Sequence, residues 1–141
     1  MLNLLNNRSY QVAVESVEKT KIGDQSRVIV TGWAVDKMRK TSLQLASMQQ
    51  SVTITRSDRA DLDKTYGLDS AAQAGFTIVM PAEQPSFNLQ LVTPGNTLSR
   101  SIRTNQLMHQ LHAQCVSKRV HQASFYAVSY THLRAHETLA N

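Results

Sequence analysis

Residues 27–35 read Arg-Val-Ile-Val-Thr-Gly-Trp-Ala-Val and carry the strongest β-strand signal in the chain. β-branched side chains dominate this stretch, and such side chains favour an extended backbone. A turn at Gly23-Asp24 precedes it, and before that turn residues 11–17 place apolar side chains at alternate positions. Alternation with period two is typical of a strand that buries one face. The sequence therefore predicts two adjoining strands within an all-β domain.

The same strand pattern recurs at residues 42–47, 51–55, 75–80 and 87–92, with a short edge strand at 98–102. Pro81 and Pro94 end two of these strands, because proline has no amide hydrogen to donate to a neighbouring strand. Residues 57–73 form a long polar loop, in which a helical turn is expected at residues 70–74. Short strands separated by turns predict a small antiparallel β-sandwich, Ig-like or jelly-roll-like.

The periodicity changes after Thr104. Apolar side chains then recur at intervals of three and four residues, at Leu107, Met108, Leu111, Cys115, Val116 and Val120. This spacing predicts an amphipathic helix that begins near residue 106 and runs beyond residue 124, with Asn105 as its N-cap. We expect four segments: a leader at 1–9, the sandwich domain at 10–104, a basic linker helix at 105–127 and a tail at 128–141.

The net charge of +5 is unevenly distributed along the chain. Residues 1–99 hold ten Lys/Arg and nine Asp/Glu, whereas residues 100–127 hold four Lys/Arg and no carboxylate. The basic character therefore belongs to the helical segment, whereas a nucleic-acid binder carries a basic face on its folded domain. An oligonucleotide-binding barrel would also need exposed aromatic side chains over a basic groove, and aromatic residues are few here. We expect no nucleic-acid partner.

Two features of the sequence concern its cellular location. Cys115 is the single cysteine, so an intrachain disulfide cannot form, which is compatible with a reducing cytoplasm. The first residues lack the basic cluster and apolar run of a signal peptide, and no apolar run reaches transmembrane length. We expect a cytoplasmic protein whose basic helix at 105–127 either lies on the anionic inner face of the membrane or packs its apolar stripe on a further domain.

The tail differs from the rest of the chain. Residues 128–138 read Val-Ser-Tyr-Thr-His-Leu-Arg-Ala-His-Glu-Thr, which resembles one translated reading frame of the transposase adapter used in shotgun DNA sequencing. His132 and His136 lie four apart beside Glu137, as in a helical zinc site. On the adapter interpretation, selection never acted on these three residues together, so we expect no metal there. We also expect the natural gene to continue past Ala127.

Trp33 allows two interpretations. It is the single tryptophan, and it lies beside Gly32 in the strongest strand. A small sandwich needs a large ring to fill its centre, which favours a core side chain. In a carbohydrate-binding module, by contrast, an exposed indole would stack on the apolar face of a sugar. The core interpretation is the preferred one.

The loop that begins at Arg56 contains three carboxylates, Asp58, Asp61 and Asp63. Calcium takes six to eight oxygen ligands in a tight loop, and the interleaved Arg56 and Arg59 would repel the cation. Two of these carboxylates could in principle form a general acid/base pair, but the sequence nearby offers no nucleophile and no set of oxyanion donors. We therefore predict Arg–Asp pairs that anchor the loop.

Other candidate chemical groups are isolated. His109 and His112 lie three apart on the predicted helix without a carboxylate nearby, which favours solvated side chains over a metal site. Cys115 falls on the apolar stripe, where we expect it to be buried and unreactive. The sequence contains no glycine-rich phosphate loop, no Gly-x-Ser-x-Gly and no Cys-x-x-Cys. We expect no enzyme active site, no cofactor and no metal.

Three short motifs occur in order along the chain: Gly32-Trp33-Ala34-Val35-Asp36, then Arg59-Ala60-Asp61-Leu62 with Tyr66 after it, then Ala74-Gly75-Phe76-Thr77-Ile78. The set resembles an N-terminal β-sandwich domain attached to GT-A glycosyltransferases of family 2, which build bacterial cell-wall and capsular polysaccharides. Leu62 stands where that family more often has valine. The resemblance covers roughly residues 10–104, and the following helix fits the linker to a catalytic domain.

The resemblance implies a non-catalytic accessory module that positions the enzyme, contacts glycan or mediates assembly. Its partner would be a nucleotide-sugar-dependent catalytic domain encoded beyond residue 127. The residues that would serve a glycan-contacting or structural role are Trp33, Asp36, Arg59, Asp61 and Phe76. Asp61-Leu62-Asp63 matches the sequence of the catalytic Asp-x-Asp motif. We assign it no catalytic role, because it lies in the loop of the accessory module. The alternative is a free-standing carbohydrate-binding module.

Overall fold

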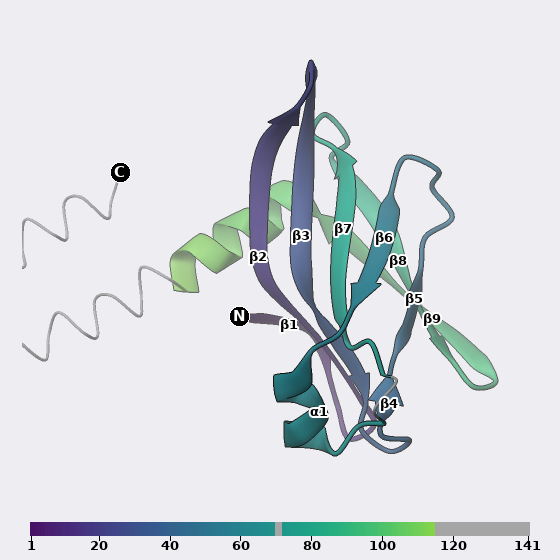
Figure 1. Ribbon diagram of the computed structural model, residues 1–141. Coiled ribbons are helices and arrows are strands. Elements are labelled where there is room, and N and C mark those ends of the chain that lie inside the picture. Colours follow the sequence, from purple (N-terminus) through teal and green to yellow (C-terminus); the bar gives the residue numbers. More distant parts are fainter. Residues whose placement is uncertain (70–71, 115–141) are drawn as a thin grey trace, which may run out of the picture.

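The computed structural model describes residues 1–69 and 72–114 (Figure 1). Within them, helix α1 spans Ala60–Tyr66 and a second helix occupies residues 104–114. The strands are β1 (Leu2–Asn6), β2 (Tyr10–Ile22), β3 (Gln25–Asp36), β4 (Thr41–Ser42), β5 (Gln44–Ala46), β6 (Thr53–Ser57), β7 (Gly75–Pro81), β8 (Ser86–Thr93) and β9 (Asn96–Arg103). The described chain is therefore mostly β, and the expected C-terminal helix follows the strands.

The strands form two antiparallel sheets with one shared core. A six-stranded sheet has the order β1-β2-β3-β7-β6, with β4 paired to β3, and a three-stranded sheet has the order β5-β8-β9. Val30 on β3 and Ile78 on β7 belong to the same buried cluster as Leu89 on β8, and all three are almost completely buried. Because successive side chains point to opposite faces of a strand, the alternation in sequence places these residues toward the other sheet.

Two hairpin turns form where the sequence predicts them. Ile22 pairs with Gln25 across a two-residue turn at Gly23-Asp24, in which Gly23 has a φ of 65°. The turn between β8 and β9 is Pro94-Gly95, where Gly95 has a φ of 77°. Proline sets the first central position of such a turn, and glycine accepts the positive φ of the second without a steric penalty.

The predicted strand at 42–47 is divided between the two sheets. Ser42 in β4 pairs with Val35 of the six-stranded sheet, whereas Leu45 in β5 pairs with Leu91 of the three-stranded sheet. Leu43 lies at the crossover and is 2% exposed. The Leu43 side chain belongs to the core cluster shared by the two sheets, so its burial holds the crossover in place.

The helix in the loop between β6 and β7 precedes residues 70–74, where the sequence analysis expected a helical turn. Helix α1 begins after Arg59 and ends at Gly67, whose φ of 64° makes a left-handed C-cap. Residues 72–74 have no helical structure, and residues 70–71 lie outside the described part. Acidic residues in the first turn and a glycine after the last turn are helix signals. The prediction of a helical turn at residues 70–74 did not take these signals into account.

Both ends of the described chain pack against the core. β1 lies within the expected leader at 1–9, and its Leu2 pairs with Val14 of β2. Leu107 is 3% exposed and belongs to the core cluster, and Leu111 packs against that cluster. The N-terminal ammonium of Met1 donates to Oε1 of Gln114 at 3.1 Å. The helix at 104–114 therefore packs as part of the same unit as the strands that precede it.

Candidate functional site

The motif residues meet where β3 and β7 run side by side. Gly32 lies opposite Phe76, and Trp33 lies opposite Gly75. A Cβ on Gly32 would be 2.0 Å from the carbonyl oxygen of Ala13 and 2.9 Å from Cζ of Phe76. Gly32 thus makes room for Phe76 on the neighbouring strand, whereas a Cβ on Gly75 would be 2.6 Å from Oγ of Ser57 and 2.9 Å from Cγ of Arg59. The dipeptides Gly32-Trp33 and Gly75-Phe76 therefore lie directly opposite each other on neighbouring strands. Phe76 lies in the core between the sheets and is 2% exposed.

Trp33 is buried beneath α1 on the other face of the same sheet. Its side chain is 4% exposed and clusters with Leu62 and Leu68 from the loop that contains the helix. The ring of Tyr66 lies 5.8 Å from the indole, centroid to centroid, at an interplanar angle of 44°. The Tyr66 hydroxyl in turn donates to Oε1 of Gln11 at 3.0 Å. This burial agrees with the core interpretation and leaves no indole face available to stack on a sugar.

Arg59 anchors the start of α1 to the sheet. Its Nε and Nη2 donate to the two carboxylate oxygens of Asp61 at 3.0 Å each, and its Nη1 lies 2.6 Å from Oε1 of Glu15. Glu15 is the extra residue of a β-bulge in β2, which turns its side chain toward the loop. Hydrogen bonding to Asp61 and Glu15 raises the pKa of Arg59, and the same contact lowers the pKa of Asp61. The prediction of Arg–Asp pairs in this loop is confirmed for Arg59 and Asp61, whereas Arg56 donates to backbone carbonyls instead.

Asp36 organises the turn between β3 and β4. Its side chain is 4% exposed, and Oδ1 accepts hydrogen bonds from the backbone amides of Met38 at 3.1 Å and Arg39 at 3.0 Å. An aspartate that accepts from amides two and three residues later fixes a tight turn. Asp36 therefore shapes the edge of the pocket described next, and its carboxylate is largely committed to the backbone.

A pocket of about 340 Å³ opens beside this turn. Its lining combines hydroxyl, amide and guanidinium groups with apolar side chains: Asp36, Arg39, Thr41, Ser42, Leu43, Gln44, Val92, Thr93 and Pro94. These polar groups offer both hydrogen-bond donors and acceptors, which a polyhydroxylated ligand such as a glycan requires. The lining therefore has the mixed polar and apolar character that suits a ligand with both hydroxyl and C–H groups.

Arg56 is a structural residue whose role the sequence analysis missed. It lies on β6, and its guanidinium donates to three backbone carbonyls: Gly75 at 3.0 Å, Leu43 at 2.6 Å and Ala74 at 3.3 Å. Burial without a neighbouring carboxylate lowers its pKa. The five donors of a guanidinium make this triple contact possible. Arg56 thereby holds β6, β7 and the β4–β5 crossover together, which no local sequence pattern reveals.

The structure places Trp33 beneath α1 on one face of the six-stranded sheet and Phe76 in the core on the other face. Arg59 and Asp61 pair with each other at the start of α1, and Asp36 lies at the pocket. His109 and His112 are exposed, in agreement with solvated side chains. Within residues 1–69 and 72–114, no group of histidine, cysteine, aspartate and glutamate side chains could hold a metal ion. Cys115 and the His132, His136 and Glu137 group lie outside the described residues.

A larger hollow, of about 640 Å³, lies at the junction of β9 and the following helix and is lined by Pro85, Ser86, Arg103, Asn105 and Gln106. It contains none of the residues in the three sequence motifs. No helix in the described part of the chain is both long and apolar enough to cross a membrane. Comparison of the chain with protein-family models, curated proteins and solved structures finds no match.

Proposed function

We propose that this chain is the non-catalytic accessory module of a bacterial family 2 glycosyltransferase, and that it contacts glycan through the pocket beside the β3–β4 turn. The observation that carries the proposal is the lining of that pocket, where Arg39, Thr41 and Gln44 offer hydrogen-bonding groups beside apolar side chains. Glycan recognition depends on such a mixture, because sugars present hydroxyl groups at their edges and C–H groups on their faces. The two sheets with their shared core form the small β-sandwich that carries this pocket.

The sequence resemblance supports the same proposal. Its motif residues interact with one another: Trp33 packs on Tyr66, and Arg59 pairs with Asp61. These contacts fix α1 and its loop on the sheet, so the motif residues have a structural role. Motif residues with a structural role are expected in a non-catalytic module. In this proposal the partner is a catalytic domain beyond residue 127, and the module works at the cytoplasmic face of the membrane.

Titration of the ¹⁵N-labelled protein with fragments of cell-wall and capsular polysaccharides tests glycan contact. We expect amide shifts to concentrate at Arg39, at residues 41–44 and at residues 92–93, which line the pocket. Thr41→Val together with Gln44→Ala removes hydrogen-bonding groups and should weaken binding by about tenfold or more. Thr53→Val is the matched control, because Thr53 is exposed on β6 and does not line the pocket. Shifts confined to other surfaces, or equal losses with Thr53→Val, would contradict glycan binding at this pocket.

A free-standing carbohydrate-binding module is the second candidate. The observation in its favour is that Leu107, from the helix at 104–114, already packs in the core of the two sheets. This packing means that the described chain covers much of its own apolar surface. The DNA downstream of codon 127 distinguishes the two candidates. A continuing frame with a strand followed by Asp-x-Asp supports the accessory module, and a stop codon soon after the helix supports the free-standing module.

A further inference from the structure

The three-stranded sheet turns one face to the core and the other face to solvent. Leu89 of β8 belongs to the core cluster, so the alternate positions from 86 to 92 on the same strand point away from the core. Pairing with β9 and β5 places the alternate positions from 97 to 103, together with Gln44 and Ala46, on this outward side. The name polar face is used below for these positions of the three strands.

Both helices in the described part of the chain pack elsewhere. Helix α1 packs through Leu62 on the outer face of the six-stranded sheet, and the helix at 104–114 packs through Leu107 in the core between the sheets. In Figure 1 the three-stranded sheet lies behind the six-stranded sheet, whereas α1 lies in front of it. The rest of the expected helix, residues 115–127, lies outside the described residues.

Uncharged polar side chains make up the middle of the polar face. Asn88 lies opposite Ser101, and Gln90 lies opposite Ser99. Asn88 and both serines are exposed, and Gln90 is half-buried. Arg100 alternates with the serines along β9 and therefore points to the other side of the strand. Amide and hydroxyl groups both donate and accept hydrogen bonds, so this part of the face suits a ligand that carries many hydroxyl groups.

Each end of the polar face borders a hollow. Ser86 lies opposite Arg103, and both line the hollow of about 640 Å³ at the start of the helix at 104–114. Gln44 lies opposite Val92, and both line the pocket of about 340 Å³ beside the β3–β4 turn. From Ser86 to Val92, β8 runs roughly 20 Å at the usual rise of a strand. The pocket beside the turn is therefore one end of a longer polar surface.

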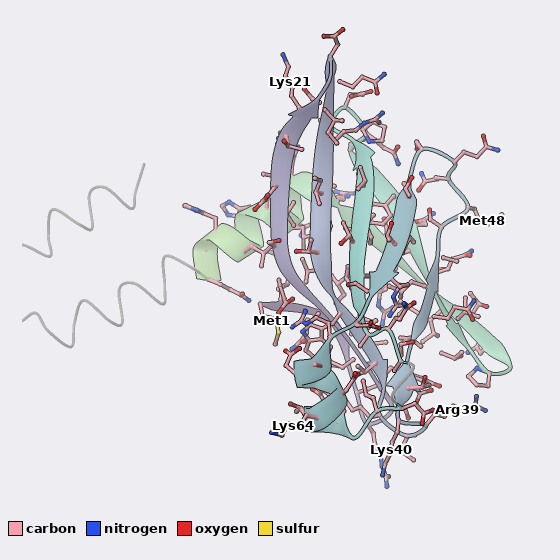
Figure 2. The ribbon with its side chains drawn as sticks, in the orientation of Figure 1. Met1, Lys21, Arg39, Lys40, Met48 and Lys64 are labelled. Carbon is pink, nitrogen blue, oxygen red and sulfur yellow. The ribbon has the colours of Figure 1, made fainter. Side chains whose placement is uncertain are left out.

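An exposed apolar side chain lies next to the middle of the polar face. The backbone amide of Asn88 donates to Oε1 of Gln49 at 3.1 Å, which holds the loop after β5 against β8. Met48 precedes Gln49 in this loop and is 83% exposed (Figure 2). A sugar ring presents C–H groups as well as hydroxyl groups. An apolar side chain beside amides and hydroxyls therefore favours a glycan over a ligand that is polar throughout.

We propose, as an extension of the proposed function on which it rests, that the polar face binds a linear, uncharged polysaccharide along β8. One end of the bound segment occupies the pocket beside the β3–β4 turn, and further sugar units lie on the amide and hydroxyl groups between the two hollows. Nucleic acid would require cations along the same path, whereas the side chains between the hollows are uncharged. An extended peptide would pair with a strand at the edge of a sheet, such as β9, and would not need this face.

A series of oligosaccharides of increasing length tests the proposal. The ¹⁵N-labelled full chain is titrated with β-1,4-linked oligomers of N-acetylglucosamine and of glucose, from the disaccharide to the hexasaccharide. We expect affinity for at least one series to rise by about tenfold or more with length, because a longer chain adds hydrogen bonds along the strand. Amide shifts should spread from the pocket through Asn88 and Ser101 toward Ser86 as the oligomer lengthens.

Variants in the middle of the polar face separate its contribution from that of the pocket. Asn88→Ala together with Ser101→Ala should weaken hexasaccharide binding by about tenfold and leave disaccharide binding unchanged. Met48→Ser should also weaken only the longer oligomers. Thr53→Ala together with Thr55→Ala is the matched control, because it removes two exposed hydroxyl groups from β6 of the other sheet. That control should bind every oligomer as the wild type does, and circular dichroism checks that each variant is folded.

Four outcomes would overturn the proposal and leave the proposed function in place. They are equal affinity for all lengths, undiminished hexasaccharide binding in the Asn88 and Ser101 variant, an equal loss in the control, and a dimer in sedimentation that the same variant disrupts. The last result would assign the polar face to a second copy of the chain.

The proposed function fails separately. Hexasaccharide binding that is lost in the Asn88 and Ser101 variant but unaffected by Thr41→Val with Gln44→Ala would contradict binding at the pocket, while the polar face would still bind glycan. Absence of binding by both series at every length would overturn the proposed function and the proposal together.

Discussion

Trp33 on β3 and Tyr66 on α1 pack with their ring centroids 5.8 Å apart, so a helix of seven residues is held on the sheet by two aromatic side chains. An isolated helix of this length is unstable in water, because the cost of nucleation exceeds the gain from so few hydrogen bonds. The tertiary contact with Trp33 is therefore a main source of stability for α1.

Removal of the indole should destabilise the protein. Trp33→Ala is expected to lower the free energy of unfolding by about 3–5 kcal/mol, because it leaves a cavity beneath α1. Urea denaturation followed by circular dichroism measures the loss. The fluorescence of the single tryptophan gives an independent check in the wild type, where emission should be blue-shifted and poorly quenched by acrylamide. A Trp33→Ala variant of unchanged stability, or strong quenching of the wild type, would instead indicate an exposed ring.

Gly32 should tolerate no side chain. A Cβ at this position would be 2.0 Å from the carbonyl oxygen of Ala13, so Gly32→Ala must displace the backbone of β2. We expect a loss of about 3 kcal/mol or more in the free energy of unfolding, or failure to fold. Gly95→Ala is the control, because a Cβ there meets no atom within 4 Å and only the positive φ opposes it. That control should cost about 1 kcal/mol. Equal losses in the two variants would show that close packing at Gly32 is unimportant.

Arg56 should not be replaceable by lysine. Lysine retains the positive charge but lacks the planar fork that reaches the carbonyls of Leu43, Ala74 and Gly75. We expect Arg56→Lys to lower the free energy of unfolding by about 2 kcal/mol, because at least one of these carbonyls loses its partner. Arg100→Lys, at an exposed position on β9, should change it by less than about 0.5 kcal/mol. Similar urea midpoints for the two variants would refute this role of Arg56.

The Arg59–Asp61 pair should contribute stability only above the acid range. Hydrogen bonding from Arg59 lowers the pKa of Asp61 below its ordinary value of 3.8. A carboxyl group with a lowered pKa in the folded state stabilises the fold above its unfolded pKa, and this contribution disappears as the pH falls through the folded value. The thermal midpoint of Arg59→Gln should therefore lie slightly below that of the wild type at neutral pH and approach it below about pH 3. A constant difference across this range would mean that Arg59 acts only through packing.

The helix at 104–114 should be required for a stable domain. Leu107→Ala removes a side chain that is 3% exposed in the core cluster and should cost about 3 kcal/mol. His109→Ala, an exposed position on the same helix, should have little effect. If Leu107→Ala is as stable as the wild type in thermal denaturation, the helix is a dispensable linker, as the segment boundary at residue 104 would imply.

Much of the fold could be predicted from local patterns in the sequence. The alternation in residues 27–35 and the turn residues Gly23-Asp24 and Pro94-Gly95 indicated the strands and hairpins correctly. The pairing of Arg59 with Asp61 was also predictable, because the two residues are close in sequence. The position of α1 was missed, although its acidic first turn and Gly67 are recognisable helix signals. Glu15 could not be linked to Arg59, since the bulge in β2 that presents it depends on pairing with β3.

The sequence alone determined most of the strands and the turn residues that join them, because period-two alternation and turn chemistry act between residues a few positions apart. It did not reveal β1, which lies within the expected leader at 1–9. The tertiary structure decided which strands became neighbours. It divided β4 and β5 between the sheets, placed Gly75 opposite Trp33, and directed Arg56 to three backbone carbonyls. These features depend on contacts between segments distant in sequence. They also depend on β3, which is covered on both faces near its C-terminal end.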